Sequence, residues 1–165
     1  MASLSELFPP QIRSSNEVKE DCISCTWILQ ICQQSSLAKE ERLDVIWHNA
    51  GIMVPPDGRK TKQGFDLQVG TNPLGPFLFQ HFLTPLCLKT VSRPDVKPFG
   101  TRVIFVSSSG HRVAPKPDGV NWDDINMEFK ARGLKYGQSK ALVNLVAIAF
   151  GFTVYNSKLE FAHES

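Results

Sequence analysis

The chain has 165 residues, a mass of 18.4 kDa and a formal net charge of +2, and 42% of its residues are hydrophobic. A chain of this length buries about 70% of its unfolded surface, so the composition predicts one globular domain that needs no disulfide or metal to fold. No block of five like charges occurs, which argues against nucleic acid or an anionic membrane as a partner.

Hydropathy also argues against a membrane span. The longest apolar run, residues 141–155, is interrupted by Asn144, Gly151 and Thr153, and it is shorter than the roughly 20 residues that a spanning helix needs. The first ten residues contain no basic residue followed by an apolar stretch, so we expect no secretory signal and a cytoplasmic protein.

Three of the four cysteines lie close together, and Cys22 and Cys25 form a CxxC pair. Such a pair is compatible with a zinc site or a redox pair, and this alternative stays open. Zinc would need further ligands at metal spacing, and neither Cys87 nor the scattered histidines supply a local pair. We therefore expect no metal and ordinary, partly buried thiols.

The chain begins with a polar stretch, and residues 1–35 are predicted to form an N-terminal arm whose structure the pattern leaves open. Within it, residues 22–34 are compatible with a helix or a strand. The sequence SLAKEERL, from Ser36, is typical of a charged helix end. LDVIWHNAG follows as an apolar run without alternation, which predicts a buried parallel strand closed by a turn.

A loop is predicted over residues 54–64, and a helix over residues 65–91 that Pro73, Pro76 and Pro85 bend or restart. Pro73 should also bias the preceding Asn72 away from helical geometry. A second loop, residues 94–100, leads into TRVIFVSSSG, a second buried strand that ends in small polar residues.

The final third contains a long loop over residues 111–128, a helix over residues 135–150 and a short strand over residues 152–155. Residues 36–155 then form the domain, and residues 156–165 a C-terminal tail. Helices and strands alternate throughout, which predicts an α/β fold with a parallel sheet and right-handed crossovers. In such sheets the functional crevice lies at the carboxyl ends of the strands.

Polar side chains that could carry chemistry follow both strands and open the last helix. Tyr136 and Lys140 are four residues apart and so share one helix face. Unit charges about 4 Å apart attract by about 4 kcal/mol at an effective dielectric of about 20, so the ammonium favours the phenolate and prepares it for proton exchange with a carbonyl or alcohol oxygen. A serine hydroxyl after the second strand could donate a hydrogen bond to the same oxygen. No GxSxG motif surrounds it, which argues against a hydrolase nucleophile.

Four motifs in order, LDVIWHNAG, VGTNPLGPF, RVIFVSSSG and YGQSK, resemble the short-chain dehydrogenase/reductase family over roughly residues 37–150. The sequence around HNAGIMVPPDG and NPLGPFLF is most similar to the retinol-dehydrogenase-like branch and to fungal reductases associated with secondary metabolism. The resemblance implies an oxidoreductase that transfers hydride between NADP(H), with NAD as the alternative, and a small-molecule carbonyl or alcohol.

The resemblance also implies a role for each matching residue. Tyr136 is the expected proton donor and acceptor, Lys140 its activator and a ligand of the nicotinamide ribose, Ser108 the residue that orients the substrate oxygen, and Asn72 a member of a proton relay through water. Tyr136 and Lys140 are also expected to bind the cofactor. Asn49, Ala50 and Gly51 match the family's NNAG motif, which lines the cofactor site, and His48 stands where the family has its first asparagine.

The family's glycine-rich turn has no counterpart, because all 11 glycines lie at or after Gly51. We therefore expect an incomplete Rossmann-like, doubly wound sheet that lacks the first βαβ unit, with its phosphate cradle, and the C-terminal substrate region. The strand at residues 43–48 would then have a bare edge that invites pairing with another chain or homo-oligomer formation. The alternative function is a catalytically inactive, truncated remnant that acts as a binding or interaction module.

Overall fold

The computed structural model describes the backbone of residues 40–163 and the side chains of residues 40–152. The predicted N-terminal arm, up to residue 35, and the CxxC pair lie outside these residues. The elements in chain order are β1 (Val45–His48), α3 (Leu67–Val69), the π-helix η2 (Gly70–Leu74), α4 (Gly75–Val91), β2 (Arg102–Phe105), the 3-10 helix η3 (Ser109–Val113) and α5 (Arg132–His163).

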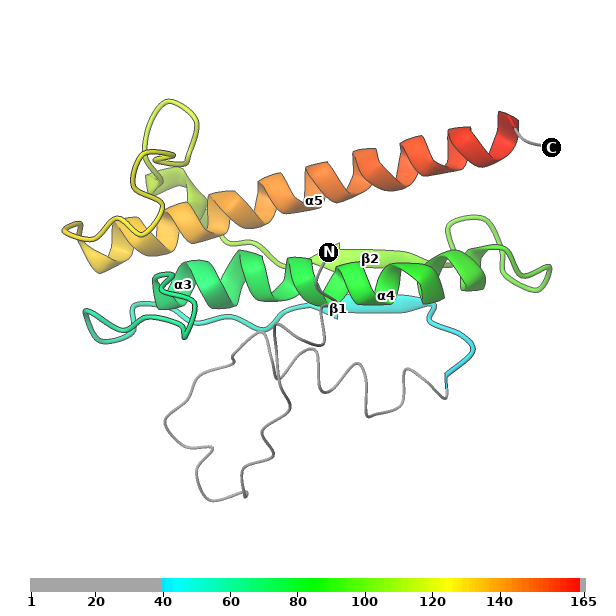
Figure 1. Ribbon diagram of the computed structural model, residues 1–165, viewed down its shortest axis with the longest axis horizontal. Coiled ribbons are helices and arrows are strands. Elements are labelled where there is room, and N and C mark those ends of the chain that lie inside the picture. Colours follow the sequence, from blue (N-terminus) through cyan, green and yellow to red (C-terminus); the bar gives the residue numbers. More distant parts are fainter. Residues whose placement is uncertain (1–39, 164–165) are drawn as a thin grey trace, which may run out of the picture.

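The two predicted strands are confirmed and form a parallel pair, with Val45 opposite Arg102 and His48 opposite Phe105. The prediction that they are buried is wrong for the described residues, because no further layer covers their outer face and only His48 is buried. The strands run alongside α4 and α5, and their carboxyl ends point toward the end of the molecule where α3 and α5 begin (Figure 1). Side chains alternate across a strand, so Phe105 points toward the helices while Trp47, 65% exposed, lies on the other face. The α/β class with a parallel sheet is therefore confirmed for the described residues.

The prolines interrupt the predicted helix at residues 65–91 as expected. Pro73 lies inside η2, Pro76 occupies the first turn of α4, and Pro85 lies within α4. The prediction that Asn72 leaves helical geometry is wrong, because Asn72 is part of η2. The wider π-turn, in which the Gly75 N–H bonds to the Gly70 carbonyl, keeps the segment helical around a proline that cannot donate a hydrogen bond.

Helix α5 includes the predicted helix at residues 135–150 and extends it at both ends. The strand predicted at residues 152–155 is wrong, since the helix continues through it to His163. β-branched and aromatic residues lower helix propensity by well under about 1 kcal/mol each, and a single glycine such as Gly151 by about 1 kcal/mol. Without a proline, these penalties do not stop a helix that is already growing.

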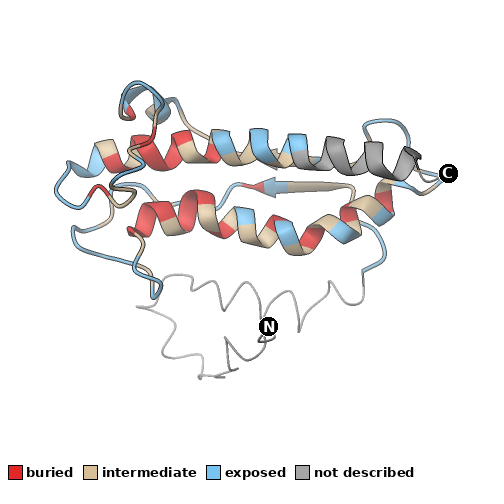
Figure 2. Ribbon diagram, turned by 45° about the horizontal axis from the view of Figure 1, so that its top comes forward, coloured by how far each residue is buried: buried red, intermediate tan, exposed pale blue. Residues whose placement is uncertain are grey.

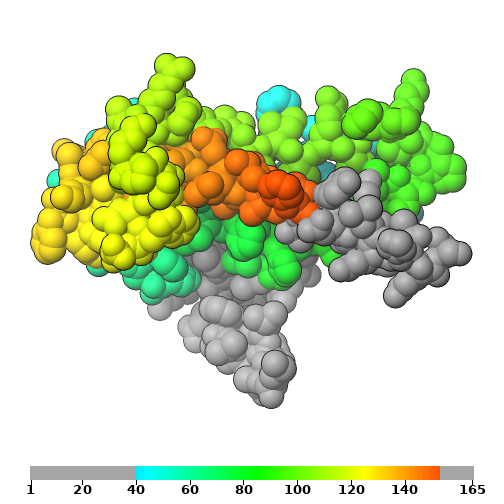
Figure 3. All heavy atoms as spheres, turned by 90° about the horizontal axis from the view of Figure 1, so that it is seen from above, coloured from blue at the N-terminus to red at the C-terminus, as the bar shows by residue number. Residues whose placement is uncertain are grey.

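Buried residues gather at the end of the molecule where α5 begins, and residues 144–152 of α5 are intermediate or exposed (Figure 2). Apolar side chains from α3, the 114–127 region and α5 form this core: Leu67, Val69, Ala114, Val120, Met127, Ala141 and Val143. In the space-filling view, the yellow loop residues ahead of α5 crowd around its first turns (Figure 3). Polar side chains are buried at the same end, namely Asp66, Gln68, Asn72, Lys135, Gln138, Ser139 and Lys140.

Candidate functional site

The two polar turns that follow β1 and β2 are brought together because the strands are parallel neighbours. His48, the last residue of β1, holds the start of the first turn through contacts with α4 and β2. Its Nε2 atom lies 2.9 Å from Oε1 of Gln80 on α4, and its ring stacks on Phe105 with the centroids 4.6 Å apart. Burial lowers the pKa of the His48 imidazole, an effect that the hydrogen bond to Gln80 partly opposes. His48 thus joins β1, β2 and α4 immediately before the Asn49-Ala50-Gly51 turn.

Gly51 lies against two predicted site residues. A Cβ atom on Gly51 would be 3.0 Å from Oδ1 of Asn72 and 3.5 Å from Nζ of Lys140. This close approach of backbone to side chains favours glycine. Asn49, Ala50 and Gly51 are themselves exposed, so the turn forms an accessible rim beside the buried Asn72 and Lys140.

Tyr136 and Lys140 lie together on α5 as the spacing predicts. The Nζ atom of Lys140 is 5.9 Å from the centroid of the Tyr136 ring, and it donates a 3.1 Å hydrogen bond to the carbonyl of Val106. In return, Oγ of Ser107 donates a 3.0 Å bond to the Lys140 carbonyl. The end of β2 therefore holds α5 by two contacts around the lysine, whose ammonium keeps N–H groups for further acceptors.

Ser108 caps η3, since its Oγ accepts a 3.1 Å hydrogen bond from the Gly110 N–H. Gly110 also lies against Tyr136, and a Cβ atom there would be 2.7 Å from Cε1 of the ring and 3.4 Å from the Ser108 Oγ. The Tyr136 hydroxyl makes no hydrogen bond within residues 40–152. The Ser108 hydroxyl accepts in its one such bond, so both hydroxyl protons are free for an oxygen atom of a ligand.

Asn72 is buried and its side-chain amide bonds in three directions. Its Oδ1 accepts from the Ile52 N–H at 2.8 Å, and its Nδ2 donates to the Ile52 carbonyl at 3.0 Å and to Oγ of Ser139 at 2.8 Å. The residue four positions later, Pro76, has no N–H, so the Asn72 carbonyl has no α-helical donor. The side chain therefore holds the turn after β1, and the carbonyl oxygen, which has two lone pairs, can accept from a further donor.

Sequence reasoning missed Ser139, which lies inside the YGQSK motif between two residues that it did assign. Ser139 is fully buried, accepts from Asn72 and donates to the Tyr136 carbonyl at 2.8 Å. Its position three residues after Tyr136 and next to Lys140 was a usable signal. The contact between Gly110 and the Tyr136 ring was missed as well. The residues around the SSSG sequence do not indicate which side chain packs on Gly110.

No family model matches the chain. Among curated proteins, the short-chain dehydrogenase/reductase pkfC of Emericella nidulans is 36% identical over 142 residues, which are 86% of this chain and 44% of that protein. An uncharacterized oxidoreductase of Schizosaccharomyces pombe is 37% identical over 70% of this chain and 34% of its own length. A short-chain dehydrogenase/reductase of Armillaria gallica is 40% identical over 63% of this chain and 32% of its own length. The chain belongs to the short-chain dehydrogenase/reductase family.

This family membership confirms the resemblance to fungal reductases that the four motifs indicate. The chain spans less than half the length of these relatives. A solved structure supports the Rossmann-like arrangement of the elements. The crystal structure of an uncharacterized protein from Mycobacterium Paratuberculosis matches with a TM-score of 0.52 and 28% identity over 71% of this chain and 36% of that chain.

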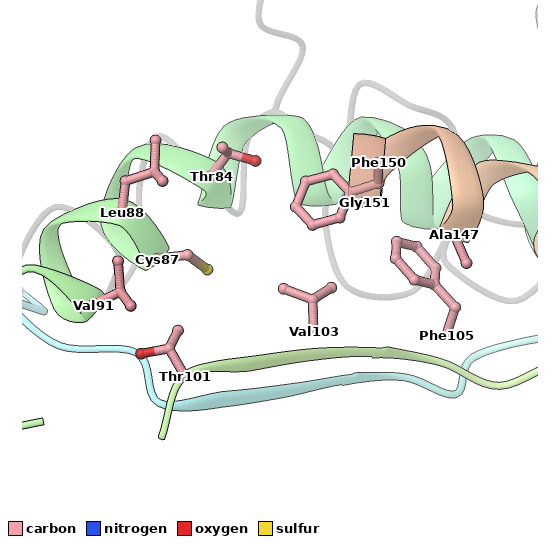
Figure 4. Close-up of a pocket in the computed structure, with 10 residues that line it drawn as sticks. All are labelled: Thr84, Cys87, Leu88, Val91, Thr101, Val103, Phe105, Ala147, Phe150 and Gly151. Carbon is pink, nitrogen blue, oxygen red and sulfur yellow. The ribbon is translucent and has the colours of Figure 1, made fainter. Parts of the chain in front are cut away.

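A cavity of about 350 Å³ lies apart from the candidate site residues, between the second half of α4, β2 and α5 (Figure 4). Its lining is mainly apolar and includes Val103, Phe105, Phe150 and the buried free thiol of Cys87. Burial raises the pKa of the Cys87 thiol, so it is a poor nucleophile. None of the candidate site residues lines the cavity.

Two further features, a metal-binding cluster and a membrane-spanning helix, are absent from the described residues. Among them, no group of three or more histidine, cysteine, aspartate or glutamate side chains could hold a metal ion. Within the same part of the chain, no helix is both long and apolar enough to cross a membrane.

Proposed function

We propose that this short-chain dehydrogenase/reductase chain transfers hydride between NADP(H) and a carbonyl or alcohol carbon of a small molecule. One observation carries the proposal. The hydroxyl-bearing side chains of Ser108 and Tyr136 pack against the same residue, Gly110, and Lys140 lies next to the tyrosine ring. Among residues 40–152, neither hydroxyl donates a hydrogen bond. The names of the fungal relatives support oxidoreductase chemistry. A role in secondary metabolism is part of the same proposal.

The residues present fit the ribose and nicotinamide end of such a cofactor. The exposed turn at Gly51 has no Cβ atom to block an approaching ligand, and the Lys140 ammonium, with one hydrogen bond made to Val106, has N–H groups left for ribose hydroxyls. Residues 1–50 contain no glycine, so these residues supply no glycine turn for the pyrophosphate end. NADP is proposed over NAD on the resemblance to the fungal branch alone.

A bound nicotinamide supplies or accepts the hydride. The chain's own residues handle the oxygen of the substrate: Ser108 donates a hydrogen bond that holds it, and Tyr136 donates the proton that turns the carbonyl into an alcohol. The phenolate that remains is stabilised by the neighbouring ammonium of Lys140. We assign the Asn72 carbonyl to a water molecule that returns a proton through Lys140. Oxidation of an alcohol uses the same groups in reverse.

The test is the loss of reduced-nicotinamide absorbance when the chain is mixed with NADPH, or NADH, and a panel of aldehydes and ketones. Tyr136→Phe keeps the ring against Gly110 but removes the proton, so kcat should fall by about 10² or more. The matched control is Tyr155→Phe, at the only other tyrosine, which should keep wild-type turnover. A Tyr136→Phe variant that turns over at the wild-type rate would contradict the proposal.

The edge of β1 that has no neighbour among the described residues favours a second candidate, a catalytically inactive module that binds another chain through this edge. In the described residues β1 has β2 as its only neighbour, and Trp47 beside that edge is largely exposed. Asp44 and His48 accept hydrogen bonds from the β2 segment, so the backbone groups of Val45, one residue along, face the other edge. Binding of this kind would persist in Tyr136→Phe and would be lost when a proline replaces Val45. Hydride transfer that depends on Tyr136 would exclude the inactive module.

A further inference from the structure

A continuous run of partly or fully buried hydrogen bonds joins the turn after β1 to the face of α5 that carries Tyr136 and Lys140. It begins at Ile52, whose N–H and carbonyl both bond to the Asn72 amide, at 2.8 and 3.0 Å. It continues from Asn72 Nδ2 to Ser139 Oγ at 2.8 Å, and from the Ser139 hydroxyl to the Tyr136 carbonyl at 2.8 Å. Asn72 and Ser139 are 67 residues apart in the chain, and both are almost wholly inaccessible to solvent.

Ser139 links the two ends of this run because its hydroxyl both donates and accepts a hydrogen bond. A serine inside a helix commonly donates to the carbonyl three or four residues earlier, and that bond fixes the rotamer of the side chain. Here it leaves the lone pairs of the Ser139 oxygen to accept from Asn72. The two N–H groups of the Asn72 amide are then both satisfied, one by Ile52 and one by Ser139.

Loss of the Ser139 hydroxyl would leave one buried N–H of Asn72 without an acceptor. A buried donor without a partner costs about 1–3 kcal/mol, so the Asn72 amide would turn or recruit another acceptor. Either change weakens its two bonds to Ile52, the residue that follows Gly51. Gly51 in turn lies against both Asn72 and Lys140, so the spacing between the turn after β1 and the lysine depends on this amide.

We infer that Ser139 is a positioning residue, which acts through Asn72 to set α5, and with it Tyr136 and Lys140, against the turn at Gly51. This inference rests on the proposed function, because it names the residue that holds the proposed acid and its activator in register with the cofactor turn. Ser139 itself is enclosed and does not touch a substrate oxygen. Its effect should therefore appear in the chemical step rather than in substrate binding.

The experiment compares Ser139→Ala with Ser92→Ala in the full chain. Ser92 is the matched control, since its Oγ also donates to a helix carbonyl, that of Leu88 at 2.9 Å. This hydrogen bond involves none of the candidate site residues. Ser139→Ala should lower kcat about 10- to 100-fold and change KM by less than about threefold, as expected for misplaced catalytic groups. Ser92→Ala should leave both constants unchanged.

A second readout is independent of turnover and of any cofactor. Amide hydrogen exchange at Ile52 should be about tenfold faster in Ser139→Ala, because the acceptor of that N–H, Asn72, loses its support. Exchange at Ile52 should be unchanged in Ser92→Ala. If the wild-type chain turns over no substrate, the proposed function fails, while faster exchange at Ile52 still supports the link through Asn72 and unchanged exchange overturns it.

Ser139→Thr addresses the case in which the alanine variant does not fold. Threonine keeps the hydroxyl and should restore kcat and slow exchange at Ile52 toward wild-type values. Wild-type kcat and wild-type exchange at Ile52 in a folded Ser139→Ala variant would overturn the inference. An equal rise in KM and fall in kcat/KM, with kcat unchanged, would also overturn it, because that pattern assigns Ser139 to substrate binding.

Discussion

Gly110 lies against the Cδ1 and Cε1 atoms of the Tyr136 ring, and a Cβ atom on Gly110 would be only 2.7 Å from Cε1. Real Cβ atoms essentially never approach a carbon so closely, so any side chain at this position must displace the tyrosine. The contact fixes where the phenol can lie relative to Ser108, whose Oγ would be 3.4 Å from the same Cβ atom.

Gly110→Ala is therefore expected to lower hydride-transfer activity by about 10² while leaving the fold intact, because a displacement of about 1 Å is enough to misalign a proton donor. The measurement is kcat with the best carbonyl substrate, together with circular dichroism to check folding. Gly133→Ala is the control, since a Cβ atom at Gly133 meets nothing within 4 Å. Equal activity of the two variants would show that the tyrosine ring does not need this contact.

Lys140→Met should reduce kcat by about 10² or more, because methionine keeps an unbranched chain but removes the ammonium beside the Tyr136 ring. It also removes the bond to the Val106 carbonyl, so some loss of stability will accompany the change. Steady-state kinetics and urea unfolding separate the two effects. Lys89→Met, in the last turn of α4, provides the comparison for removing a lysine elsewhere. Retained turnover in Lys140→Met would remove the lysine from the mechanism.

The free energy of unfolding should fall as the pH is lowered from about 7 to about 5, partly because of His48. Burial lowers the folded-state pKa of His48 below the ordinary value of 6.5, so the unfolded chain binds the proton more tightly. The stability that depends on neutral His48 is present above about pH 6.5 and is lost as the pH falls toward the folded-state pKa.

Urea unfolding at pH 7.5 and pH 5.5 measures this change. His48→Asn should show a smaller difference between the two pH values than the wild type, whereas His81→Gln, at an exposed position on α4, should keep the wild-type difference. The carboxylates whose pKa is lowered by arginine or lysine, such as Asp44 beside Arg42, contribute equally in all three proteins. A wild-type pH dependence in His48→Asn would contradict the assignment to His48.

Leu83→Ala should lower the free energy of unfolding by about 2–5 kcal/mol, because Leu83 is only 2% exposed and its removal leaves a cavity beneath α4. Leu145→Ala makes the same chemical change on α5, where the side chain is 38% exposed, and should cost less than about 1.5 kcal/mol. Both values come from chemical unfolding at neutral pH. Similar losses in the two variants would place the core elsewhere.

Local sequence was sufficient for both strands and for the interrupted helix. The strands are unbroken apolar runs, such as VIFV before Ser107, and the prolines restrict the backbone wherever they occur. It failed at residues 152–155, where β-branched and aromatic residues suggest a strand but lie in the continuation of α5. The prediction for Asn72 was also wrong, because a π-turn accommodates Pro73 and keeps Asn72 helical.

The candidate site divides in the same way. Tyr136 and Lys140 are four residues apart on one helix, so their proximity follows from helix geometry alone, and the sequence by itself also determined the order of the turns and strands that carry Asn49 to Gly51 and Ser108. Only the tertiary structure decided that Ser139 accepts a hydrogen bond from Asn72 and that Gly110 lies against the Tyr136 ring. Each of these contacts joins residues from different elements, and a periodic pattern carries no information on how two elements rotate against each other. That rotation is set by the packing of whole faces, which forms only when the chain has folded.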